Sequence, residues 1–350
     1  MKDINTANIH KLDEMIAGAH RIGIVTHIKP DGDALGSATG LWYFLNGTGK
    51  TESCIFLPGD YQHTQDFLLD DEVKKQIVIY EGNESAAEAK LLDCDLIICC
   101  DFPAFHRAGG YGNVLKLSKA SKILIDHHLS PDREAFGLSF SETEVSSTSE
   151  FIYFILKSLL ELRNEEARLP AKSMTSLMTG MTTDTNNFAN SVKPTTLLMA
   201  SELIAAGVDR DAILCRLYNN FSESRTRLLG HILKDLLTVT PDGVAYIILD
   251  KKTLKEYNVH EGDTEGFVNK PLEIAKVRMS ILCKEDEHNP GEVRVSIRSK
   301  AGVSANNCSR LYFNGGGHEQ AAGGKLYMDI TEVPAYIEEK THIYFNDENE

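Results

Sequence analysis

The sequence predicts an α/β protein of two domains, the first built on a doubly wound, mainly parallel sheet. Strongly apolar runs at residues 22–25, 96–100 and 123–125 alternate with segments of helical periodicity. This alternation is the pattern of parallel strands joined by crossover helices. The alternation of apolar runs and helical segments changes at Pro241-Asp242-Gly243, where we place the start of the second domain. A chain of 350 residues is long enough for two domains that each bury a core of their own.

Composition and charge restrict the class of partner. The apolar content of 42% and charged content of 25% are typical of a soluble globular protein. We find no apolar run of the roughly 20 residues that span a bilayer, and no signal peptide. The seven cysteines form no Cys-x-x-Cys pair, so we expect a reducing, cytoplasmic compartment. A net charge of -15 argues against binding of long nucleic acid, so a phosphate-ester substrate would be small or short.

The first half of the chain shows alternating elements. Its apolar spacing predicts a helix over 7–20, a strand over 22–25 and an amphipathic helix after the following loop. Strands near 53–57, 96–100 and 123–125 follow, with a helix over 86–92 between the first two of them. Further helices are predicted over 151–160 and from near Pro170 to the polar segment 183–188. Ser147-x-x-Glu150 has the spacing of a capping box, and Pro170 suits a first helical turn.

The second half is expected to form a connector and a smaller sheet. The predicted elements are helices over 194–206, 210–218 and 222–237, strands over 244–249, 277–283 and 293–298, a glycine-rich loop over 314–318 followed by 321–324, and a frayed acidic tail after Tyr344. The predicted domains are therefore residues 1–190, a helical connector over 191–240, and a C-terminal α/β domain over 241–350.

Acidic and histidine side chains follow three of the predicted strands. They are His27, Asp31 and Asp33 after the first strand, Asp101 after 96–100, and Asp126-His127-His128 after 123–125. Because the carboxyl ends of parallel strands meet at one edge of a sheet, we expect these side chains to converge there. Asp184 lies in a polar loop after a Met-rich helix. By itself it would indicate nothing, and it becomes a candidate only together with the other residues of this set.

Each group has a simple structural explanation on its own. The loop of His27, Asp31 and Asp33 could be a hydrogen-bonded turn, and Asp101 could cap a helix. Taken together, carboxylates and imidazoles without cysteine are typical of a two-metal phosphoryl-transfer site, and suit Mn²⁺ or Mg²⁺ better than structural zinc. Without such ions, the like charges would repel one another and raise the carboxylate pKa values.

These residues carry a family resemblance over nearly the whole chain. His27-x-x-x-Asp31-x-Asp33, the isolated Asp101, Asp126-His127-His128 and Asp184-Thr185 resemble the four motifs of the DHH phosphoesterase superfamily. Gly315-Gly316-Gly317-His318 resembles the signature of the C-terminal domain found in one branch of it. The size and layout are most similar to the group of nano-RNases (oligoribonucleases) and 3′-phosphoadenosine-5′-phosphate phosphatases.

The resemblance implies roles for these residues. The implied metal ligands are His27, Asp31 and Asp101 for one ion, and Asp33, Asp101, His127 and Asp184 for the other. The implied catalytic residues are Asp101, which would bridge the ions, and His128, which would face the substrate. Asp126 would orient His127, as ligating histidines usually require. The implied substrate-binding residues are Arg298, Gly315, Gly316, Gly317 and His318.

The glycine-rich loop supports an anion site on physical grounds as well. Three glycines let backbone N–H groups approach an anion closely. The alternative is a simple glycine turn between a helix and a strand.

Our hypothesis is a metal-dependent phosphodiesterase that degrades very short oligonucleotides to 5′-mononucleotides and also removes the 3′-phosphate of adenosine 3′,5′-bisphosphate. The expected cofactors are two divalent ions, Mn²⁺ in preference to Mg²⁺. The expected partners are short RNA or DNA oligonucleotides or small nucleotides, without long nucleic acid or membranes; a homodimer through the first domain is left open. The alternatives are a phosphodiesterase for cyclic or linear dinucleotides, a RecJ-type single-strand exonuclease, a family II inorganic pyrophosphatase, and a non-catalytic nucleotide sensor.

Overall fold

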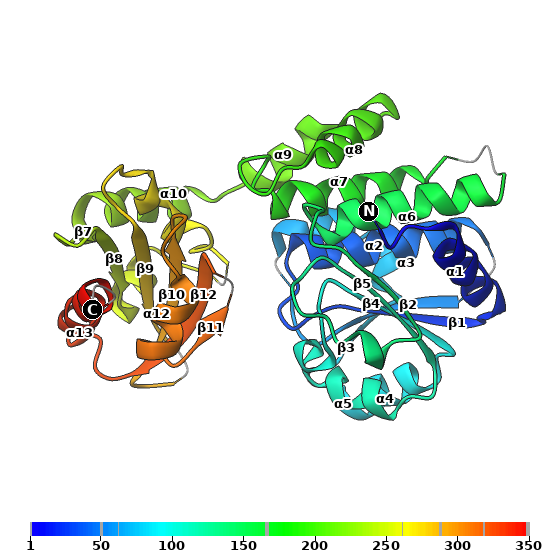
Figure 1. The fold of residues 1–350 in the computed structure, drawn as a ribbon. Helices are drawn as coiled ribbons and strands as arrows, with labels where there is room; N and C mark the ends of the chain where they lie inside the picture. Colours follow the sequence, from blue (N-terminus) through cyan, green and yellow to red (C-terminus); the bar gives the residue numbers. More distant parts are fainter. Residues whose placement is uncertain are drawn as a thin grey trace. The chain divides into compact units, whose positions relative to one another are not determined.

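The protein forms two compact α/β units, residues 1–220 and 221–350 (Figure 1). A computed structural model describes residues 2–49, 52–61, 63–164, 168–260, 262–286, 289–317 and 319–347. Residues 191–240, the expected connector, are largely helical and are divided between the two units. Within the described part of the chain, no helix is both long and apolar enough to cross a membrane.

Unit 1 is built on a six-stranded sheet whose strands are all parallel. Their spatial order is β3 (Ile77–Ile79), β2 (Glu52–Leu57), β1 (Arg21–Val25), β4 (Leu96–Cys100), β5 (Ser121–Asp126) and β6 (Leu138–Ser141). The order of strands reverses between β1 and β4. The carboxyl ends of these two strands therefore form the switch point at which open α/β sheets bind ligands.

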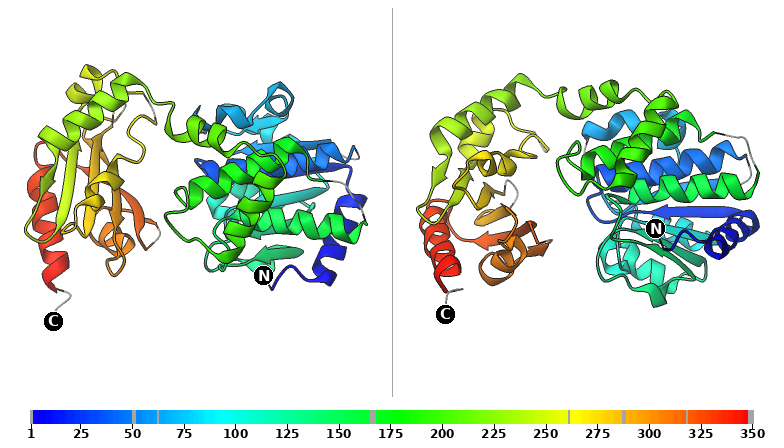
Figure 2. Two further views of the ribbon diagram at one scale, coloured as in Figure 1. Left: turned by 90° about the horizontal axis from the view of Figure 1, so that it is seen from above. Right: turned by 45° about the horizontal axis from the view of Figure 1, so that its top comes forward.

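Helices cover both faces of this sheet, which makes it doubly wound as predicted. One face packs against α1 (Thr6–Gly18), α2 (Gly32–Gly47), α6 (Thr148–Leu162) and α7 (Ala171–Asp184), and the other against α4 (Glu84–Leu92) and α5 (Tyr111–Leu117) (Figure 1 and Figure 2). The remaining elements are η1 (His63–Leu68), α3 (Asp71–Lys74), η2 (Phe105–Ala108), η3 (Arg133–Ala135), α8 (Pro194–Ala205) and α9 (Arg210–Tyr218).

Helix α2 differs from its prediction. We expected an amphipathic helix, but every residue from Gly32 to Leu45 is buried. The sheet covers one side of α2, and α6 and α7 cover the other. A helix enclosed in this way is apolar or small on all sides.

The close packing of α2 on α7 requires glycine. A Cβ atom at Gly36 would lie 2.6 Å from the backbone oxygen of Ser176. We expect Gly36→Ala to lower the free energy of unfolding by about 1–3 kcal/mol, the usual cost of overpacking, as measured by urea denaturation. Gly18→Ala is the control, because a Cβ there would meet no atom within 4 Å. Equal losses for the two variants would contradict this packing.

Unit 2 is built on a mixed six-stranded sheet. Its spatial order is β11 (Gly316–Gly317), β12 (Ala321–Tyr327), β10 (Glu292–Ser299), β9 (Met279–Glu285), β8 (Val244–Leu249) and β7 (Thr238–Val239), and only β8 and β9 are parallel. One face packs against α12 (Ala305–Tyr312) and α13 (Val333–Asp347); the other packs against α10 (Glu223–His231), the π-helical turn η4 (Ile232–Leu236), α11 (Lys251–Glu256) and η5 (Phe267–Glu273).

Two predictions for unit 2 were wrong. Residues 321–324, expected as a loop, begin strand β12. The chain beyond Tyr344, expected to fray, continues α13 to Asp347, and residues 348–350 lie outside the described residues. The tail is held because Tyr344 is buried and its hydroxyl donates to the Ser304 carbonyl at 2.9 Å.

Candidate functional site

The loop after β1 positions two of the predicted ligands at the start of α2. Asp31 is the N-cap of this helix, and its Oδ1 accepts the N–H groups of Asp33 and Ala34 at 3.0 and 3.1 Å. His27 is only 8% exposed, and its Nδ1 lies 2.9 Å from the Ile28 carbonyl. Because this carbonyl can only accept, Nδ1 carries a proton. The Nε2 atom of His27 lies 3.8 Å from Asp31 Oδ1.

Asp101 lies between two groups of candidate ligands. Its Oδ2 is 3.5 Å from His27 Nε2, and its Oδ1 is 3.6 Å from His127 Nε2. The Thr148 hydroxyl donates to Oδ1 at 2.8 Å. Asp101 has φ +68°, a left-handed conformation that is uncommon outside glycine and often marks functional sites. Each carboxylate oxygen therefore faces a different group.

The second group consists of Asp33, His127 and Asp184. His127 Nε2 lies 3.6 Å from Asp184 Oδ2. One ligand atom from each of the three lies within 4.8 Å of the others, and the same holds for His27, Asp31 and Asp101. The structure thus brings all six predicted metal ligands together at the carboxyl edge of the sheet.

Sequence reasoning missed two residues at the N-terminus of α6. The N–H of Thr148 donates to Asp33 Oδ2 at 2.7 Å, and the N–H of Ser149 donates to Asp33 Oδ1 at 2.9 Å. A helix N-terminus stabilises negative charge in this way. The Ser147-x-x-Glu150 pattern located the helix start, but nothing in the sequence placed it beside Asp33.

The predicted capping box is half formed. The Ser147 hydroxyl accepts the N–H of Glu150 at 3.0 Å, as expected. The Glu150 carboxylate, however, accepts from the N–H of Ser146 at 3.1 Å and from the Thr196 hydroxyl at 2.6 Å. Glu150 therefore ties α6 to the start of α8.

Asp126 orients His128, and not His127 as we had expected. Its Oδ1 lies 2.7 Å from His128 Nδ1. The prediction failed because successive residues of an extended segment point to opposite sides, so residues two positions apart share a side. His127 is consequently directed to Asp101 and Asp184, while His128 is held by a fully buried carboxylate.

Burial and neighbouring charges displace several pKa values. For Asp184, burial and the charges of Asp101 and Asp31 raise the pKa to about 8, and burial also raises the pKa of Asp33. Burial lowers the pKa of His27, but Asp101 and Asp31 outweigh it and raise this pKa to about 11. For Asp101, burial is outweighed by the neighbouring histidines, which lower the pKa to about 2.

The donor set fits divalent cations. It offers carboxylate oxygens and imidazole nitrogens without sulfur, which suits Mn²⁺ or Mg²⁺. Burial lowers the pKa of His127 and favours the neutral imidazole that can bind a metal. Burial raises the pKa values of Asp33 and Asp184, the negative charges of neighbouring carboxylates raise them further, and a cation would relieve this repulsion.

The predicted substrate-binding residues belong to unit 2. Arg298 lies on β10, where its Nη1 donates to the Ile297 carbonyl at 3.0 Å, and burial lowers its pKa although Glu265 opposes this. The expected role of Arg298 in substrate binding stays a prediction. His318 lies outside the described residues.

The glycines of this loop are needed for close packing and hydrogen bonding within unit 2. A Cβ atom at Gly315 would lie 1.9 Å from the Gly323 carbonyl oxygen. The N–H of Gly315 donates to the Ser309 carbonyl at 3.3 Å, and the N–H of Gly317 donates to Asn306 Oδ1 at 2.9 Å. Two of the three donors that we expected to bind an anion are therefore already bonded within the unit.

Comparisons with known proteins match the chain over both units. A model described as "DHH family, N-terminal domain" matches residues 21–181, and one described as "DHHA1 domain" matches residues 242–340. The probable bifunctional oligoribonuclease and PAP phosphatase NrnA of Streptococcus mutans is 31% identical over 90% of this chain and 92% of its own. The bifunctional oligoribonuclease and PAP phosphatase NrnA of Bacillus subtilis is 30% identical over 86% of this chain and 88% of its own. The structure of an exopolyphosphatase-related protein from Bacteroides fragilis is 32% identical, with a TM-score of 0.91 and full coverage of both chains.

Proposed function

The chain belongs to the DHH family and is a hydrolase of the phosphoesterase class, and from this premise we propose its substrates and cofactors. It hydrolyses very short oligonucleotides to 5′-mononucleotides and removes the 3′-phosphate of adenosine 3′,5′-bisphosphate. It does so with two divalent ions, Mn²⁺ in preference to Mg²⁺. The names of the NrnA relatives and the net charge of -15 support short substrates.

The main support for the proposal is the position of Asp101. Its two oxygens face separate ligand groups, which is the arrangement that a bridging carboxylate needs. His27 and Asp31 would complete one metal site, and Asp33, His127 and Asp184 the other. Divalent ions held by these residues would supply an activated water and positive charge for the phosphoryl oxygens.

His128 would act on the leaving group. Burial lowers its pKa, but the hydrogen bond to Asp126 outweighs this and raises the pKa. The bond also fixes the orientation of the imidazole. A histidine held in this way can donate a hydrogen bond or a proton to a phosphoester oxygen.

A substrate panel tests the proposed function. We would measure kcat/KM with Mn²⁺ and with Mg²⁺ on dinucleotides, tetranucleotides, long single strands, adenosine 3′,5′-bisphosphate, a cyclic dinucleotide and pyrophosphate. We expect turnover to fall as the strand lengthens and Mn²⁺ to give the faster reaction. Affinity that rises with strand length, with a steep dependence on salt, would contradict the proposal.

Metal binding should depend on pH, because Asp184 and His27 must lose protons to bind an ion. Both folded-state pKa values, about 8 and about 11, lie above the ordinary values of 3.8 and 6.5. The stability that these protons give the metal-free protein is therefore lost as the pH rises toward those values, whereas metal affinity grows. We expect the rise in melting temperature caused by Mn²⁺ to be larger at pH 8 than at pH 6.5.

The control for this measurement is Asp184→Asn, which removes one of the two titrating groups. Its Mn²⁺-induced shift should be smaller and should change less with pH. A shift in the unmodified protein that is the same at both pH values would contradict the assignment of these ligands.

A further inference from the structure

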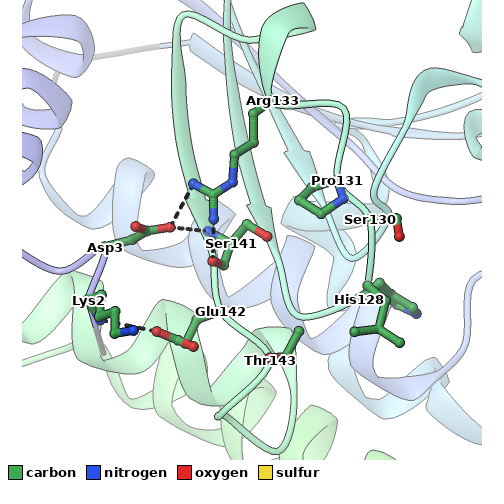
Figure 3. Close-up of a pocket in the computed structure, with 10 residues that line it drawn as sticks. Lys2, Asp3, His128, Ser130, Pro131, Arg133, Ser141, Glu142 and Thr143 are labelled. Carbon is green, nitrogen blue, oxygen red and sulfur yellow. Dashed lines mark hydrogen bonds and ion pairs between the residues drawn. The ribbon is translucent and has the colours of Figure 1, made fainter.

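A cavity of about 290 Å³ opens in unit 1 beside His128 (Figure 3). Its walls come from three separate segments: the N-terminal residues Lys2 and Asp3, the loop over 128–131 with Arg133, and residues 141–143 at the end of β6. We call it the His128 cavity. The site described above does not use it.

His128 joins this cavity to the candidate metal ligands. Its Nδ1 lies 2.7 Å from Asp126 Oδ1 and 3.8 Å from Asp101 Oδ1, while the same residue lines the cavity. A phosphoryl group at Asp101 and a group bound in the cavity would therefore be neighbours. The cavity is therefore in a position to bind the group that is esterified to the scissile phosphate.

The cavity is poorly suited to a second phosphate. The guanidinium of Arg133 is already engaged, with Nη1 at 3.1 Å from Asp3 Oδ2 and Nη2 at 2.8 Å from the Ser141 carbonyl. Glu142 adds a negative charge, and its Oε2 accepts the N–H of Lys2 at 3.1 Å. Acidic and basic groups thus offset one another, as the dashed contacts in Figure 3 show.

The remaining walls suit a sugar and a base. Leu129 is 78% exposed, which is unusual for leucine, and together with Pro131 it offers apolar surface. Ser130 and Thr143 add hydroxyls, and Asp3 and Glu142 add carboxylate oxygens. Ligand pockets usually start at roughly 300 Å³, so this cavity has room for about one nucleoside.

We propose that the His128 cavity binds one nucleoside of a dinucleotide substrate, the one joined to the scissile phosphate on the side of His128. This inference rests on the proposed function and adds a reason for the short substrate, because the cavity holds a single nucleoside. Removal of the 3′-phosphate of adenosine 3′,5′-bisphosphate also expels a nucleoside through its 3′-oxygen, so this substrate would occupy the cavity as well. A p-nitrophenyl ester of a 5′-mononucleotide has p-nitrophenol as its leaving group in place of a nucleoside, and its hydrolysis does not use the cavity.

Thr143→Trp tests the proposal by filling the cavity from an exposed turn. We expect kcat/KM for a dinucleotide to fall at least about tenfold, mainly through KM, because bulk in a closely fitting pocket excludes its ligand. Hydrolysis of the p-nitrophenyl ester of a 5′-mononucleotide should be unchanged. Binding of a non-hydrolysable dinucleotide analogue, measured by calorimetry, should weaken by the same factor. Leu129→Ala provides a second variant, for which we expect a loss of roughly fivefold on the dinucleotide alone.

Glu144→Trp is the matched control, since Glu144 is the neighbouring residue on the same turn but does not line the cavity. It should leave both substrates unaffected. Equal effects of Thr143→Trp on the two substrates, or no effect on either, would overturn the proposal. The failure of the proposed function looks different, because the unmodified protein would then hydrolyse neither substrate with Mn²⁺.

Discussion

Asp101→Asn should reduce Mn²⁺-dependent hydrolysis by about a thousandfold or more. Metal ions supply several kcal/mol to phosphoryl transfer, and each 1.36 kcal/mol corresponds to a factor of ten. Replacing the carboxylate with an amide removes the negative charge that would be shared between the two ligand groups. The rate constant should be measured on a dinucleotide and on adenosine bisphosphate, both at saturating Mn²⁺.

The substitution of Asp101 by asparagine removes the charge of the side chain and keeps its shape. Asparagine is among the residues that best tolerate the left-handed conformation of Asp101, and its amide oxygen can still accept from the Thr148 hydroxyl. We therefore expect the variant to fold, with a metal-free melting temperature that changes only through the loss of the Asp101 charge beside His27. Asp211→Asn, on the exposed start of α9, is the control and should keep full activity. Activity of Asp101→Asn within tenfold of the unmodified protein would contradict the bridging role.

Asp184→Asn should have the second-largest effect, with opposite consequences for activity and for stability without metal. Activity should fall by about a hundredfold to a thousandfold, because one ligand group loses a charged oxygen. The metal-free variant should be more stable than the unmodified protein at pH 6.5, and by a larger margin at pH 9. The reason is that the folded protein keeps the Asp184 carboxyl protonated up to a pKa of about 8, whereas the unfolded chain releases this proton near pH 3.8, so folding is penalised increasingly between these two values.

Thermal unfolding in the presence of a chelator, at pH 6.5 and pH 9, checks this second prediction. Asp211→Asn again serves as the control, and its melting temperature should respond to pH as the unmodified protein does. A metal-free Asp184→Asn protein that is less stable at pH 9 would show that Asp184 contributes to folding rather than to ion binding.

The sequence identified the strands that carry the site because these strands are buried. All five residues of β4 are buried, so an uninterrupted apolar run marks it, and the ligands follow directly where this strand and its neighbours end. Strands β3 and β6 escaped prediction. Strand β6 is only four residues long, and its two serines interrupt the apolar pattern, whereas β3 is a short apolar run, Ile77-Val78-Ile79, that sequence reasoning missed.

Side-chain pairing within the site depended on geometry that spacing does not encode. The order of Asp126, His127 and His128 is plain in the sequence, but the extended backbone decides that Asp126 meets His128. The contact of Thr148 and Ser149 with Asp33 likewise depends on how α6 crosses the sheet. The glycines at 315 and 317 are needed for close strand packing, which the motif alone does not reveal.

Anomalous scattering from crystals grown with Mn²⁺ tests the central claim most directly. The account predicts two manganese peaks per chain, one beside each oxygen of Asp101, with His27 and Asp31 on one side and Asp33, His127 and Asp184 on the other. A single peak, or peaks at which Asp101 contacts only one ion, would contradict it.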